Sequence, residues 1–151
     1  MSDSLSPSIT LKDVAILSEE ITSLRSKVTQ AYNEKEKLLS DLVDNYDHII
    51  EEYRRLNLFF THPSIDYHTA VGPILANPEY NVIVVYNPVS GEVLELNFNR
   101  NTEEPYPLSK LITEGHFNTA VEGIRFMDKQ LNVHIAALKT ELEKMNDIEI
   151  M

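Results

Sequence analysis

The chain has no cysteine among its 151 residues, and this absence removes several kinds of chemistry at once. Disulfides, thiolate metal sites and cysteine nucleophiles are excluded. Only four glycines are present, and no phosphate-cradling glycine-rich loop, dinucleotide fingerprint or nucleophile elbow occurs. We therefore expect the protein not to be an enzyme and to need no cofactor.

Basic residues and long apolar runs are also scarce. Thirteen lysines and arginines stand against 24 acidic residues, and the resulting net charge of −11 is spread along the chain. Binding to a phosphate backbone needs a basic patch, so we expect no direct contact with nucleic acid. A small acidic inhibitor that mimics nucleic acid is one alternative. No apolar stretch reaches membrane-spanning length and the N-terminus does not resemble a signal peptide, so we expect no membrane partner and a location in the cytoplasm or nucleus.

A seven-residue apolar repeat near the N-terminus is the most prominent feature that is present. If Val14 is position a, β-branched residues occupy the first three a positions, and leucine occupies the first two d positions. This pattern favours a parallel two-stranded coiled coil, and a lysine at position a costs stability but can fix register. The predicted dimerisation residues are Val14, Leu17, Ile21, Leu24, Val28 and Lys35.

The helix that carries this repeat has a clear start and no internal breaker. Thr10 is a good N-cap, and the Asp13 carboxylate can reach back to it. No proline or glycine follows until after Asn57, so the sequence predicts one helix of about 48 residues, ~70 Å long. We divide the chain into a disordered arm (1–9), a coiled coil (10–45) and a small head with a closing C-terminal helix (46–151).

A second apolar stripe appears after Leu38, where the helix is expected to meet the head. A wide apolar face of this kind is typical of a helix that packs on a domain. Its members are Leu39, Val43, Tyr46, Ile50, Tyr53, Phe59 and Phe60.

The middle of the chain predicts a β-hairpin, which makes the fold class α+β. Residues 82–86 are apolar on both faces, 87–91 form a turn with glycine at its end, and 92–98 alternate. Residues 99–107 are polar and extended, and Pro105 and Pro107 argue against regular structure there. A short helical turn at 108–112 precedes a last helix from about Phe117 to Asp147, which repeats apolar residues at Phe117, Val121, Ile124, Leu131, Ile135, Leu138, Leu142 and Met145.

Three aromatic residues near the hairpin are candidates for binding a protein partner: Tyr86, Phe98 and Tyr106. Aromatic anchors supply interface energy at low entropic cost, although core filling is the ordinary role of such residues. Tyr106, which lies beside prolines and charges, is expected to be partly exposed. His62, Asp66 and His68 could in principle hold zinc, but their spacing in a loop is loose and we expect no metal site.

The order of a coiled coil, a head with a hairpin, the Tyr106-Pro107 loop and a closing helix resembles RWD-headed kinetochore and chromosome-segregation proteins. From the apolar repeat and the head we expect a non-enzymatic assembly or adaptor subunit that pairs with a second copy or a related chain, as a homodimer or heterodimer, and docks a protein partner on its head. The resemblance implies a place in a chromosome-segregation or similar multi-subunit complex. The order of helix, hairpin and helix is also similar to a prefoldin subunit, a chaperone in which the two long helices of one chain pair antiparallel. Both alternatives stay open at the level of sequence.

Overall fold

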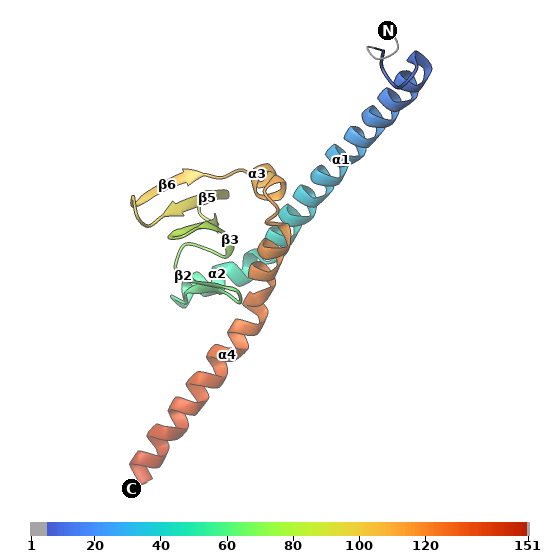
Figure 1. Ribbon diagram of the computed structural model, residues 1–151. Coiled ribbons are helices and arrows are strands. Elements are labelled where there is room, and N and C mark those ends of the chain that lie inside the picture. Colours follow the sequence, from blue (N-terminus) through green and yellow to red (C-terminus); the bar gives the residue numbers. More distant parts are fainter. Residues whose placement is uncertain (1–5, 151) are drawn as a thin grey trace.

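The computed structural model describes residues 6–150 and shows a small head on the side of a long helical rod (Figure 1). The predicted α+β class is confirmed. Residues 1–5 of the predicted disordered arm lie outside the described residues. In chain order the elements are α1 (Leu11–Asn45), α2 (Asp47–Arg55), β1 (Phe60–His62), β2 (Ile65–Thr69), β3 (Ile74–Glu79), β4 (Val82–Asn87), β5 (Glu92–Asn97), β6 (Thr102–Pro105), α3 (Leu108–Thr113) and α4 (Phe117–Ile150).

Helix α1 begins as the sequence predicts but ends earlier. Thr10 Oγ1 accepts a hydrogen bond from the Asp13 amide at 3.2 Å, and the Asp13 carboxylate accepts one from the Thr10 amide at 3.3 Å. The prediction of one helix to Asn57 is wrong, because Tyr46 leaves helical geometry (φ −96°, ψ 4°) and separates α1 from α2. The Tyr46 hydroxyl donates to Asp128 of α4 at 2.7 Å.

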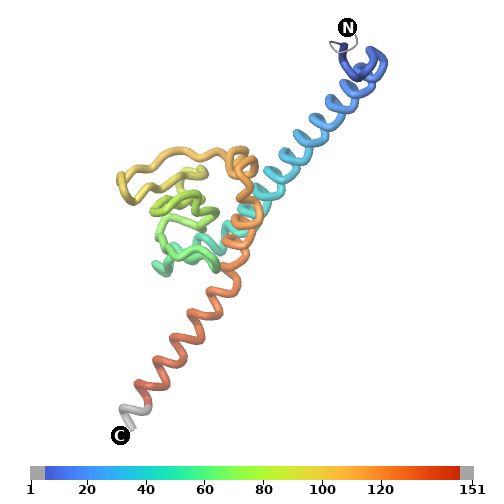
Figure 2. Tube along the Cα trace, viewed as in Figure 1, coloured from blue at the N-terminus to red at the C-terminus, as the bar shows by residue number. Residues whose placement is uncertain are grey.

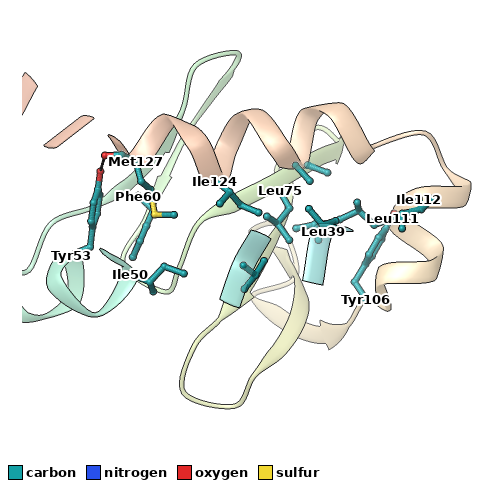
Figure 3. Packing of buried hydrophobic residues seen from close by; sticks show 14 residues of the cluster. Leu39, Ile50, Tyr53, Phe60, Leu75, Tyr106, Leu111, Ile112, Ile124 and Met127 are labelled. Carbon is teal, nitrogen blue, oxygen red and sulfur yellow. Dashed lines mark hydrogen bonds between the residues drawn. The ribbon is translucent and has the colours of Figure 1, made fainter. Parts of the chain in front are cut away.

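The second apolar stripe forms the helical side of the core, as predicted. Leu39 and Val43 of α1 and Ile50 and Tyr53 of α2 are buried against the sheet and α4, as the close view in Figure 3 shows for several of them. Phe59 departs from the prediction, since about half of its side chain is exposed. The head therefore holds the C-terminal part of α1 rigidly.

A four-stranded antiparallel sheet with the order β3-β4-β5-β6 lies between two apolar clusters. The predicted hairpin is β4–β5, with Val85 opposite Leu94 and Gly91 at φ 73° in the turn. Side chains such as Val84 face the helices, whereas Ile83 and its neighbours face the β1–β2 hairpin. The small sheet is thus covered on both sides.

Strand β6 corrects the expectation that residues 99–107 lack regular structure. It pairs with β5 over four positions, from Asn97 opposite Thr102 to Leu94 opposite Pro105. β6 is an edge strand, and an edge tolerates proline because a backbone N–H is not needed on its open side.

Helices α1 and α4 lie side by side in the middle of the rod and run in the same direction. Lys35 Nζ of α1 lies 5.4 Å from the centre of the Phe117 ring at the start of α4. Further along the chain, the Tyr53 hydroxyl of α2 donates to the Met127 carbonyl of α4 at 2.9 Å. The N-terminal part of α1 and the C-terminal part of α4 therefore project from opposite ends of the head (Figure 2). The antiparallel intrachain pairing of the prefoldin-like alternative is not what the structure shows.

Candidate interaction surface

The N-terminal two-thirds of α1 forms an arm that the head does not cover. Every side chain from Leu11 to Lys35 is exposed. The predicted dimerisation residues share this exposure, and Ile21 is typical at 51%. A row of half-exposed Val, Ile and Leu along one helix is an apolar surface that a single copy of the chain leaves in water. We call it the α1 seam: Val14, Leu17, Ile21, Leu24 and Val28.

The charges that flank the α1 seam are compatible with a parallel pair of identical helices. In such a pair each g position lies beside the e position of the following heptad in the partner helix. Glu20 at g would face Arg25 of a second copy, and Lys27 at g would face Tyr32. No like-charged pair arises in this segment.

Lys35 occupies position a but has a contact within its own chain. Its ammonium group lies over the Phe117 ring at the start of α4. A cation over an aromatic face is attracted by the ring quadrupole. Lys35 therefore marks the place where the α1 seam reaches α4.

Beyond Lys35 the seam continues as one wall of a groove. Leu38, Leu42 and Asn45 of α1 line it on one side, and Phe117, Val121 and Arg125 of α4 line it on the other. The groove has a volume of about 320 Å³, and Leu38 is 60% exposed. On the α1 side of the groove, Leu38 is at position d and Leu42 at position a, so these two residues continue the heptad repeat of the α1 seam.

The three aromatic candidates for partner binding do not form one site. Tyr86 packs beside the helical cluster at the end of β4, whereas Phe98 follows β5 at the opposite end of the hairpin. The expectation that Tyr106 is partly exposed is wrong, because only 2% of its side chain is accessible. Its ring belongs to the core (Figure 3), and its hydroxyl donates to the Glu114 carboxylate.

Phe98 has one aromatic neighbour, Tyr67, that the sequence did not single out. Its ring, 46% exposed, stacks on Tyr67 of β2 with 5.7 Å between ring centres. The Tyr67 hydroxyl donates to Asn81 Oδ1 and accepts from the Asn81 amide, and Tyr80 beside it is 82% exposed. We call Tyr67, Tyr80 and Phe98 the aromatic edge. Its members are 13 and 18 residues apart along the chain, so no local motif indicates it.

His62, Asp66 and His68 do not converge on one point. His62 is buried, with Nε2 2.7 Å from the Thr119 carbonyl of α4 and Nδ1 accepting from the Ser64 amide. The His68 ring instead packs edge-on against Phe59 at 4.8 Å. Within residues 6–150 no group of three His, Cys, Asp or Glu side chains is placed to hold a metal ion.

The buried polar side chains of the head serve its packing. Tyr53 donates to the Met127 carbonyl, and burial raises the pKa of its phenol well above the usual value. Gln130 accepts from Tyr53 and donates to the Phe59 carbonyl. In the described part of the chain, every buried side-chain nitrogen and oxygen has a hydrogen-bond partner.

Comparisons with protein-family models, with curated proteins and with solved structures find no match to this chain. Across residues 6–150 no helix has both the length and the apolar character needed to cross a membrane.

Proposed function

We propose that the protein is a non-enzymatic assembly subunit that forms a parallel homodimer through the α1 seam and docks a protein partner on its head. The observation that carries the proposal is the exposure of an entire coiled-coil seam on α1. Burying apolar side chains is worth ~25 cal/mol per Å², so a row of this length strongly favours association with another helix.

Three features support a second copy in parallel orientation. The β-branched a layer of Val14, Ile21 and Val28 is typical of parallel dimers. Glu20 would meet Arg25 of the second copy on both sides of the coil. The pairing also leaves both heads beside the same end of the coil, where they can act together.

The aromatic edge supports a docking role for the head. Tyr80 and Phe98 expose large apolar rings on two neighbouring turns, which are joined by a hydrogen bond from the Phe98 amide to the Asn81 carbonyl. Such rings are preferred anchors in protein interfaces. The Tyr106-Pro107 loop follows β6, the last strand, which is the position that the resemblance to RWD-headed proteins implies. An adaptor of a multi-subunit complex, of the chromosome-segregation kind, is the function that we infer.

The variant Ile21→Asp tests the dimer. A carboxylate at the centre of the seam would be buried twice in the coil, so we expect light scattering to fall from twice the mass of the 17.3 kDa chain to a single mass. Amide chemical shifts of the head should not change.

Ser26→Asp is the matched control, because Ser26 lies at the outer f position of the same arm. This variant should stay dimeric. A wild-type chain that remains monomeric at high concentration would contradict the proposal. An Ile21→Asp variant that keeps the dimer mass would contradict it equally.

A further inference from the structure

The C-terminal part of α4 carries a second exposed apolar stripe that the head does not cover. From Ile135 to Asn146 every side chain is exposed, and Leu138 is 65% accessible. The apolar residues keep alternating spacings of four and three. We call this stripe the α4 seam: Ile135, Leu138, Leu142 and Met145.

We propose that the α4 seam pairs in parallel with the α4 seam of a second copy, so that the dimer holds two coiled coils on opposite sides of its heads. This inference rests on the proposed dimerisation through α1. It adds a second interaction surface and names its occupant.

The direction of the helices is the first argument for a second copy. α1 and α4 of one chain run in the same direction, because Lys35 of α1 contacts Phe117 at the start of α4 and Tyr46 at the end of α1 contacts Asp128 further along α4. A parallel α1 coil has its two-fold axis along the coil. The same axis would make the two α4 helices parallel. In the single chain, α4 leaves the head on the side opposite to the projecting part of α1 (Figure 1).

Continuity of the apolar surface is the second argument. The groove between α1 and α4 joins seam residues Leu38 and Leu42 to Phe117 and Val121. A partner helix that follows the α1 seam is thereby led to the face of α4. If Val121 is position a of α4, the next a position is Asp128, whose carboxylate accepts from the Tyr46 hydroxyl of the same chain. The next d position, Leu131, packs on the head core, so the free α4 seam starts at Ile135, at position a.

The flanking charges are the third argument. In a parallel pair, His134 at g would face Lys139 of the second copy, and Glu141 at g would face Asn146. Neither pair brings two acidic groups together, although the chain carries a net charge of −11. Repulsion between acidic side chains therefore does not oppose self-pairing of the seam.

The α4 seam is too short to pair independently. It spans about two heptads, and helices of that length are marginal in water. Once the α1 coil has formed, however, the second pairing is intramolecular, with an effective concentration in the millimolar range. We therefore expect the α4 coil to form only in chains that are already joined through α1.

Single-cysteine variants test the inference cleanly, because the natural chain has no cysteine. In the full-length chain we expect Leu138→Cys at position d to form an interchain disulfide under mild oxidation, as Leu24→Cys in the α1 seam should. Thr140→Cys at outer position f, two residues away, is the matched control. We expect its cross-linked fraction to be at least about tenfold lower, because f positions lie too far apart across a coil for disulfide geometry.

The outcomes separate the two proposals. Cross-linking of Leu24→Cys but not of Leu138→Cys would overturn the α4 coil and leave the α1 dimer intact. Failure of both, with a monomer mass, would overturn both. A disulfide that forms only between Leu24→Cys and Leu138→Cys chains in a mixture would show head-to-tail contact and would overturn the α4 coil.

Stability of the dimer gives a second readout. Leu142→Asp should raise the dimer dissociation constant by about tenfold or more while the mass at high concentration stays that of a dimer. Thr140→Asp should leave the constant unchanged. Equal constants for Leu142→Asp and wild type would overturn the inference.

Discussion

Gly123 shows how closely α4 approaches the sheet. A Cβ atom added at this position would lie 2.0 Å from the carbonyl oxygen of Ile74 in β3 and 2.7 Å from the His62 ring. Backbone cannot yield as a flexible side chain can. Glycine is therefore required here by contact and not by conformation, and it sets the distance between the helix and β3.

Gly123→Ala should lower the free energy of unfolding by about 1–3 kcal/mol, since overpacking forces α4 away from β3. In a helix interior, alanine is more favourable than glycine by about 1 kcal/mol. If the added methyl group met no obstacle, the variant would therefore be more stable than wild type. Urea unfolding at a fixed protein concentration measures the difference. A more stable variant would show that α4 does not touch β3 at Ile74.

Two buried tyrosines give the head a sensitivity to alkaline pH. Burial raises the pKa of Tyr53, and burial together with the hydrogen bond to Glu114 raises that of Tyr106. In the unfolded chain both phenols ionise near their ordinary value of 10.0. Above that pH the unfolded state releases protons that the folded state keeps, so the stability contributed by the neutral phenols falls as the pH rises.

The double variant Tyr53→Phe/Tyr106→Phe should lose this dependence. Its free energy of unfolding should be lower near neutral pH by about 1 kcal/mol for each lost hydrogen bond. Between about pH 9 and about pH 11 it should decline less steeply than that of wild type. If the free energies of unfolding of the variant and of wild type, measured by urea titration, fell equally steeply with pH across this range, the effect of burial would be contradicted.

At the scale of elements, α1 has two functions on two faces. Leu39 and Val43 enter the head core, whereas Leu38 and Leu42, one position earlier in each case, stay on the groove side. The sequence reveals this division because the stripe widens after Leu38. It does not reveal the break at Tyr46, whose hydroxyl donates to Asp128, 82 residues away.

Lys35 lies where these two faces meet, and its replacement tests the seam. Lys35→Leu would lose a cation–π contact of about 0.5–1 kcal/mol but bury an apolar side chain worth about 1.5–3 kcal/mol in each chain. We expect a higher urea midpoint at equal protein concentration. Lys37→Leu at the outer c position should not raise the midpoint, and a drop in stability for Lys35→Leu would place Lys35 outside the seam.

Strands were predictable only where their signal is local. The β4–β5 hairpin has an apolar run, a proline turn and Gly91, so sequence alone places it. Strands β1, β2 and β6 are short and mostly polar, so their own residues do not predict a strand. Each depends on pairing with a neighbouring strand. Tyr106 illustrates the same limit, because prolines and charges beside it in the chain say nothing of the α3 residues that enclose it.

At the scale of the whole molecule, the layout of a long N-terminal helix, a head and a closing helix could be predicted, but the direction of α4 could not. Two apolar repeats in one chain are equally compatible with antiparallel and parallel packing. The direction of α4 depends on where the chain between the two helices ends, and therefore on the length and packing of the intervening sheet. Strands β3 to β6 and helix α3 bring Phe117 back beside Lys35, so α4 starts next to the middle of α1 and continues in the same direction.

The overlap of α1 and α4 determines how the molecule would carry a mechanical load. Tension applied to the two projecting ends would slide the helices past each other along their shared length, with Leu39, Ile124 and Met127 resisting together. Helix α4 also packs on β3 within the same cluster, so the sheet would share this load. The resistance to tension along the rod would therefore be set by core side chains that are loaded in shear.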